Sequence, residues 1–161
     1  MRFVFVDRIM AIDIGRSIET LKNVSATEDI FTDHFPGHPV FPGALLVESF
    51  EQAAQLLVTQ TYGFARLGRL ERLSRVAFRH FVRPGDQVRV RCERRDTDEN
   101  AWTVYATARV DGRTVATAVL VFGLEDVAAD SETAECVARL QELWGTLRDE
   151  LFETPGAVGI P

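Results

Sequence analysis

Residues 33–55 read DHFPGHPVFPGALLVESFEQAAQ, and the segment changes character at Pro42-Gly43. Before that point, proline or glycine recurs at almost every second or third position. Because proline fixes the backbone angle φ and glycine leaves it free, a regular helix or strand is not expected there. After it, most residues through Val58 are apolar, and proline is compatible with the first turn of a helix. The segment therefore predicts an irregular loop followed by a helix that ends near Tyr62-Gly63.

The predicted helix carries one narrow polar strip. Its polar residues recur at intervals of four, three and four, which places them on one side of the helix: Glu48, Gln52, Gln55 and Thr59. Glu51 lies beside the strip. Because the helix is otherwise apolar on nearly every side, the remainder of the chain must enclose it. Burial of an ionised carboxylate without a partner is costly, so we expect Glu48 to be kept as a neutral acid that can donate a proton.

Length and composition place the chain in a broad class. Its 161 residues suffice for one domain with a sizeable core, and 46% hydrophobic and 26% charged residues are typical of a soluble globular protein. We expect neither a signal peptide nor a membrane span, and therefore a cytoplasmic location. The net charge of −6 argues against general nucleic-acid binding. Cys92 and Cys136 lack metal-ligand spacing, so neither a zinc site nor a disulfide is expected.

The segments around the central helix differ in periodicity. Two strands are predicted before it, over residues 2–13 and 17–24, followed by a short acidic turn at residues 27–31. After the helix, arginine occupies every third position of residues 66–75, which is typical of a loop or a solvated helix face. A strand is predicted at residues 76–82, where His80 alternates with apolar residues and is expected to lie in the core.

The second half of the chain predicts an antiparallel meander. Strands are expected near residues 87–93, 102–110 and 114–123, and Asp111-Gly112 is a strong hairpin signal. Asp130 or Ser131 can then cap an amphipathic terminal helix. The sum is an α+β domain at residues 1–125, with an antiparallel sheet curled around one helix, and a helical extension at residues 126–161.

The central motif resembles that of the β-hydroxyacyl-acyl-carrier-protein dehydratases. Glu48 lies fourteen residues after His34, and Gln52 lies four further on. The segments that match in order and spacing, over about residues 3–122, are His34-Phe35-Pro36-Gly37-His38-Pro39, Phe41-Pro42-Gly43, Val6-Asp7-Arg8-Ile9, Leu21-Lys22-Asn23-Val24, Phe78-Arg79, Arg83-Pro84-Gly85-Asp86-Gln87 and Ala108-Arg109-Val110-Asp111-Gly112.

The resemblance implies a hotdog fold and a homodimer, or a higher oligomer built from it, with sites at the subunit interface. It implies an enzyme that removes water from a (3R)-3-hydroxyacyl chain on an acyl carrier protein, giving the trans-2-enoyl thioester in fatty-acid or polyketide assembly. His34 of one chain would be the base, and Glu48 of the other would be the acid. The Gly43 N–H would bind the substrate carbonyl, the Val40 carbonyl would orient His34, and Gln52 would hold a water or the acid.

The chemistry of these residue types agrees with such an elimination. A neutral imidazole can accept the α-proton, a protonated carboxyl can protonate the departing hydroxyl, and helix-start amides can stabilise an oxyanion. No metal or organic cofactor is needed beyond the phosphopantetheine that carries the substrate. A structural role for His38 is implied by the resemblance.

Several alternatives stay open. A series of four arginines is either a solvated face or a binding surface for the acidic carrier protein or its phosphate: Arg66, Arg69, Arg72 and Arg75. Arg72 stands near a position where the family usually has glycine, which leaves acyl length open. The tail can pack on the chain's own body or dock onto a partner enzyme. The rival functions are a hotdog thioesterase, double-bond isomerisation by the same residues, and an inactive subunit that binds the acyl carrier.

Overall fold

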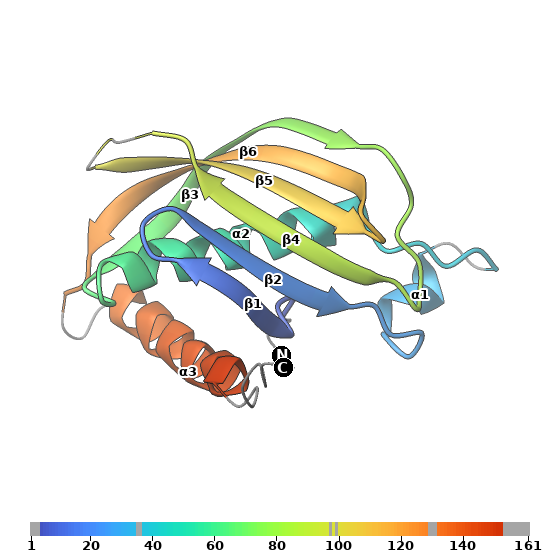
Figure 1. The fold of residues 1–161 in the computed structure, drawn as a ribbon, viewed down its shortest axis with the longest axis horizontal. Helices are drawn as coiled ribbons and strands as arrows, with labels where there is room; N and C mark the ends of the chain where they lie inside the picture. Colours follow the sequence, from blue (N-terminus) through green and yellow to red (C-terminus); the bar gives the residue numbers. More distant parts are fainter. Residues whose placement is uncertain (1–3, 35–36, 97, 99, 129–131, 153–161) are drawn as a thin grey trace, which may run out of the picture.

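The computed structural model describes residues 4–34, 37–96, 98, 100–128 and 132–152 (Figure 1). Within them, six strands form one antiparallel sheet in the order β1-β2-β4-β5-β6-β3. The sheet curls around α2, so the predicted hotdog architecture is confirmed. The elements are β1 (Arg8–Asp13), β2 (Ser17–Asn23), α1 (Ile30–Asp33), α2 (Gly43–Thr61), β3 (Arg66–Phe78), β4 (Gln87–Arg94), β5 (Ala101–Val110), β6 (Arg113–Asp126) and α3 (Glu132–Phe152).

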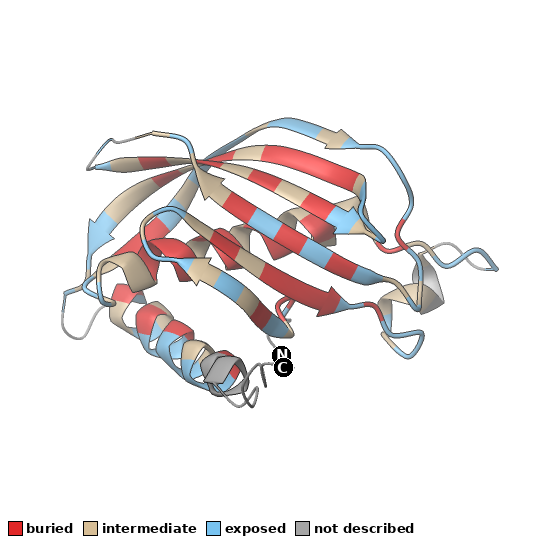
Figure 2. Cartoon of the chain, viewed as in Figure 1, coloured by how far each residue is buried: buried red, intermediate tan, exposed pale blue. Residues whose placement is uncertain are grey.

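The core lies between α2 and the concave face of the sheet. α2 begins directly after Pro42, where the proline and glycine pattern predicted it to begin. Small and large apolar side chains of its inner face are completely buried, as Figure 2 shows along the helix: Phe50, Ala53, Ala54, Leu56, Leu57 and Val58. Trp102 and Phe122 are the largest buried side chains that the sheet contributes. Burial of this much apolar surface is the main force that wraps the sheet around the helix.

The predicted meander is confirmed over β4, β5 and β6. Burial alternates along β4, with Val88, Val90 and Cys92 turned inward. Asp111 and Gly112 turn the chain between β5 and β6 with φ values of 48° and 77°. Two successive residues with positive φ are what a tight hairpin turn of this kind requires.

The sequence prediction for residues 66–75 was wrong, because this segment belongs to β3. The pairing of β3 with β6 shifts register between Leu70 and Arg72 and again between Ser74 and Ala77. A bulge inserts an unpaired residue and breaks the alternation of a strand, so the arginines recur every third residue although the backbone is extended. β3 ends at Phe78, and His80 is exposed rather than in the core.

Near both ends of the chain, the observed elements differ in detail from the predicted ones. β1 begins at Arg8 rather than near the first residue, and the predicted turn after β2 contains the start of the short helix α1. The terminal helix is confirmed as α3, although its predicted caps lie outside the described residues. α3 lies across the opening of the sheet, against β1 and α2 (Figure 1). Among the described helices, none combines the length and hydropathy that a bilayer crossing requires.

Candidate active site

The loop before α2 fixes the orientation of His34. This residue follows α1 directly, is half-buried, and its Nδ1 lies 2.9 Å from the carbonyl oxygen of Val40. Because a carbonyl only accepts, Nδ1 carries the proton of this hydrogen bond. In the neutral ring, Nε2 is then left with a lone pair that can accept a proton. The contact between His34 and Val40 is the one that the family resemblance implies, whereas His38 in the same loop is exposed.

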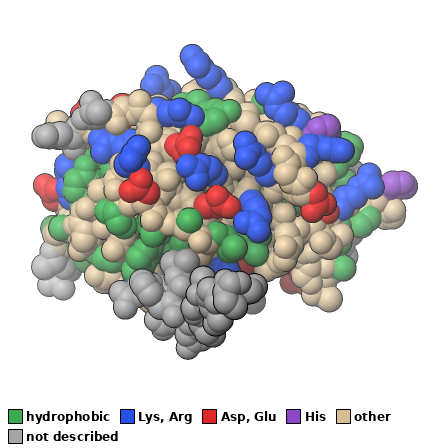
Figure 3. Space-filling model, in the orientation of Figure 1, with side chains coloured by type: hydrophobic (Ala, Val, Ile, Leu, Met, Phe, Trp, Pro, Cys, Tyr) green, Lys and Arg blue, Asp and Glu red, His purple; other side chains and the backbone are tan. Residues whose placement is uncertain are grey.

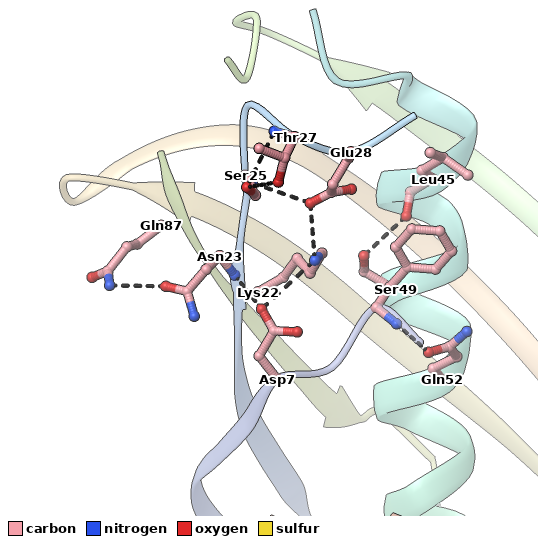
Figure 4. Close-up of polar contacts among 11 residues, drawn as sticks. Asp7, Lys22, Asn23, Ser25, Thr27, Glu28, Leu45, Ser49, Gln52 and Gln87 are labelled. Carbon is pink, nitrogen blue, oxygen red and sulfur yellow. Dashed lines mark hydrogen bonds and ion pairs between the residues drawn. The ribbon is translucent and has the colours of Figure 1, made fainter. Parts of the chain in front are cut away.

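Glu48 and Gln52 form a linked pair on α2. The Gln52 side-chain amide donates from Nε2 to Oε1 of Glu48 at 2.8 Å, across one helical turn. Its carbonyl oxygen accepts the backbone N–H of Phe5 at 2.8 Å (Figure 4). These two bonds set the direction of the amide, so Gln52 presents a donor to the half-buried Glu48 carboxyl. Spacing predicted the Glu48–Gln52 pair but not Phe5, which lies 47 residues away in sequence.

An ion-pair network anchors the N-terminal segment that supplies this backbone N–H (Figure 4). Lys22, only 8% exposed, contacts Asp7 at 3.7 Å and Glu28 at 3.1 Å. Asp7 also accepts the backbone N–H of Asn23 at 2.6 Å, and Asn23 accepts from the Gln87 amide at 2.9 Å. Most of these residues come from the motifs that carry the family resemblance. Their contacts tie the N-terminal segment to β2, and they therefore position Gln52 indirectly.

The first turn of α2 presents backbone N–H groups beneath an aromatic ring. The first N–H groups of a helix have no intrahelical partner, and the helix dipole makes this end suited to an oxyanion. Gly43 is the first residue of α2, and a Cβ added there would lie 2.8 Å from Cε1 and Cζ of Phe78. Any larger residue there would require the ring of Phe78, which is 54% exposed, or the start of α2 to shift. The sequence placed Phe78 in a strand and in a segment of the family match, but it did not predict this contact.

Three residues of the polar strip, Glu48, Gln52 and Gln55, line a groove of about 1380 Å³ between α2, β3 and α3, whereas Thr59 is buried. Glu48, Glu51 and Gln52 line the groove, and His34 is not among the residues that line it. Burial raises the pKa of Glu51 above its ordinary value, and the neighbouring charge of Glu48 adds to this rise. A ligand in the groove can therefore reach Glu48 and Gln52.

The structure divides the four predicted arginines into two pairs. Arg66 contacts Asp126 at 3.0 Å, and its guanidinium lies 5.3 Å from the centre of the Tyr62 ring. Arg69 contacts Glu125 at 2.7 Å. These two guanidiniums are already engaged with groups of the chain itself.

Arg72 and Arg75 lie instead beside a hollow of about 440 Å³ on the outer face of the sheet, next to Arg95. Over the face seen in Figure 3, basic side chains are interspersed with acidic ones. Among the ion pairs of the chain, Arg91 contacts Glu93 at 2.9 Å. Within the described part of the chain, neither Arg72 nor Arg75 has such an ion pair. They are the members of the series best placed to meet an external anion.

Comparisons with known proteins show the family to which the chain is similar. The model of the FabA-like domain matches residues 1–119. The 3-hydroxyacyl-[acyl-carrier-protein] dehydratase FabZ of Granulibacter bethesdensis is 44% identical over 119 residues, covering 72% of this chain and 70% of that protein. The FabZ dehydratase of Rickettsia felis is 36% identical over 116 residues, covering 71% of this chain and 80% of that protein.

Solved structures share the fold at low identity. The dehydratase heterocomplex ApeI:P from Xenorhabdus doucetiae aligns with a TM-score of 0.62 and 14% identity, covering 76% of this chain and 84% of that one. The PaaI protein of Escherichia coli aligns with a TM-score of 0.58 and 15% identity, covering 72% and 81%. Since the family model spans most of the sheet and all of α2, this chain belongs to the FabA-like family.

Proposed function

We propose that this protein is a dehydratase that removes water from a 3-hydroxyacyl chain carried by an acyl carrier protein. The observation that carries the proposal is the orientation of two groups on one scaffold. The Val40 carbonyl holds His34 with Nε2 able to accept a proton, and Gln52 holds Glu48 beside the groove. The names and identities of the relatives support the same reaction.

The proposed reaction moves two protons in opposite directions. Nε2 of His34 takes the α-proton, and the electron pair of that C–H bond moves toward the thioester carbonyl, whose oxygen is stabilised by the N–H of Gly43. Glu48 gives its proton to the β-hydroxyl, the C–O bond breaks, and water leaves as the α,β double bond forms. Transfer of a proton from His34 back to Glu48 through solvent restores both groups. This route needs no metal and no organic cofactor besides the phosphopantetheine of the carrier.

The proposed enzyme is a homodimer whose sites combine residues of two chains. β3 is an edge strand of the sheet, and an unpaired edge is a template for another strand. Exposed apolar side chains lie on β3 and just beyond it: Leu73, Val76, Phe78 and Phe81. Because Glu48 lines the groove and His34 does not, we propose that His34 of one chain faces Glu48 of the other.

Turnover of a carrier-bound 3-hydroxyacyl substrate, followed by mass for the loss of water, tests this function. We expect His34→Ala and Glu48→Gln each to lower kcat by about a hundredfold or more. Glu135→Gln is the matched control, because it makes the same change on an exposed carboxyl of α3 that does not line the groove.

Three other results would point elsewhere. Release of free acid without enoyl product would identify a thioesterase. A shifted double bond would identify an isomerase that uses the same residues. No reaction at any chain length would favour a subunit that only binds the acyl carrier.

We further propose that Arg72 and Arg75 bind the acidic surface of the carrier protein or the phosphate of its pantetheine arm. Reversal of both to glutamate should raise KM for the carrier-bound substrate by about tenfold and leave a short pantetheine thioester lacking the phosphate unaffected. Arg89→Glu is the control, since that arginine already contacts Glu19 at 3.2 Å. Equal effects on both substrates, or from the control, would contradict the assignment.

A further inference from the structure

We infer that α3 forms one wall of the acyl-binding groove and sets the longest acyl chain that the protein accepts. The inference rests on the proposed function and extends it to the substrate. Family membership does not supply it, because the matched region ends at residue 119, before α3 begins.

α3 has two neighbouring faces with different surroundings. Val137 and Leu147 are buried, with 4% and 5% exposure, and hold the helix on the body of the protein. Side chains at helical spacing beside them line the groove: Cys136, Arg139, Leu140, Glu142, Leu143 and Thr146. The stripe of Val137 and Leu147 thus packs α3 onto the rest of the protein, and the neighbouring stripe faces the groove beside α2.

The opposite walls of the groove carry the groups that an acyl thioester needs. α2 supplies the polar Glu48 and Gln52, whereas β3 supplies Leu67 and Leu70. A 3-hydroxyacyl thioester likewise has its polar reacting centre at one end and an apolar chain extending from it. With the reacting centre at Glu48, the acyl chain continues between β3 and the leucines of α3, where burial of each methylene group is favourable.

Substitution at Leu143 tests the wall, because this side chain is half-buried and lines the groove. Leu143→Phe should narrow the groove and Leu143→Ala should widen it. Gln141→Phe adds the same ring to an exposed position of α3 and is the matched control.

The measurement is kcat/KM for pantetheine thioesters of 3-hydroxybutanoate, 3-hydroxyoctanoate and 3-hydroxydodecanoate. We expect Leu143→Phe to lower the ratio of dodecanoyl to butanoyl turnover by about tenfold, and Leu143→Ala to raise it. Unchanged ratios in both Leu143 variants, or the same change in Gln141→Phe, would overturn the inference.

Cys136 gives a readout that does not depend on catalysis. The chain has two cysteines, and Cys92 is fully buried with a thiol pKa raised by that burial, so alkylation reports on Cys136. We expect the 3-hydroxydodecanoyl pantetheine thioester to slow alkylation of Cys136 by iodoacetamide, and pantetheine alone not to do so. Protection that instead appears with rising protein concentration would assign the groove to a second copy of the chain and overturn the inference.

The two readouts separate failure of the inference from failure of the proposed function. If the protein dehydrates no substrate but Cys136 is protected by the long acyl chain, the acyl-binding groove stands and the dehydratase proposal falls. In the opposite case the protein dehydrates its substrates, the long acyl chain does not slow alkylation of Cys136, and the Leu143 variants leave the chain-length profile unchanged. The dehydratase proposal then stands and the role of α3 falls.

Discussion

At the scale of single residues, the candidate side chains are held in place by hydrogen bonds to backbone groups and to one another. His34 is oriented by the Val40 carbonyl, and Glu48 is oriented by Gln52, which is itself held by Phe5. Such supporting contacts matter because a displacement of about 1 Å at a reacting group can cost a hundredfold in rate. The residues that touch the substrate are therefore only part of what the reaction needs.

Gly43→Ala should impair the reaction through Phe78. The added methyl would stand 2.8 Å from the ring, so either the ring or the start of α2 must move. We expect kcat/KM to fall by about tenfold or more. Phe78→Leu removes the clashing ring atoms, and the double variant should recover most of the loss. A double variant as slow as Gly43→Ala would show that the effect does not pass through Phe78.

Glu51 should make the free energy of unfolding depend on pH. Its pKa is raised in the folded chain above the ordinary 4.5, so the unfolded chain releases this proton first as pH rises. The free energy of unfolding therefore falls as pH rises from 4.5 through the pKa of the folded chain, and it stays lower at higher pH. Glu51→Gln should be more stable than the native chain at neutral pH, with the difference vanishing below about pH 4. Urea unfolding across this range measures it, and a difference that is constant with pH would show that ionisation of Glu51 is not its cause.

At the scale of elements, β3 has two roles that its sequence did not predict. It closes the sheet against β6, and its other edge has no strand beside it within the described chain. Arg69 lines the groove, whereas Arg72 and Arg75 lie beside the hollow on the outer face, and a register shift separates Arg69 from Arg72. A bulge re-aims side chains in this way, so binding surfaces on both sides of one strand are a consequence of its irregular pairing.

A charge on the free edge of β3 should weaken the proposed dimer. Val76 is 36% exposed there, and Val76→Asp would place a carboxylate in an interface that needs apolar contact. We expect a loss of about 2 kcal/mol in the free energy of dimerisation, read as a higher dissociation constant in sedimentation equilibrium. Ile14→Asp is the control, because Ile14 is 49% exposed in the turn between β1 and β2. Equal effects of the two changes would place the interface elsewhere.

At the scale of the whole molecule, the proposed site needs two chains. α2 and the sheet of one chain supply Glu48 and the groove, whereas the loop that carries His34 lies at the start of α2 and outside the lining of the groove. Symmetry then gives two equivalent sites for each dimer, each with one residue from either chain.

Mixing two inactive variants tests this arrangement. After exchange of subunits between His34→Ala and Glu48→Gln, half of the dimers are mixed, and each mixed dimer has one intact site. The mixture should therefore regain about a quarter of the native turnover. If both residues acted within one chain, no intact site would form and the mixture would stay inactive.

Local signals in the chain suffice to predict the loop and α2, the meander and the central candidate residues. Proline and glycine set the backbone before α2, and alternation of apolar and polar residues marks the strands β4 to β6. The match of residues 1–119 to the FabA-like domain confirms the family that the motif of His34 and Glu48 indicated.

The contacts that these residues make depend on the packing of distant segments, so they can be seen only in the folded chain. The bond from Phe5 to Gln52 joins positions 47 residues apart, and the bulges of β3 exist only in its pairing with β6. The groove between α2 and α3 depends on where the terminal helix comes to rest. Local periodicity carries no information about such long-range contacts, because they are selected by how well whole elements bury their apolar surfaces against one another.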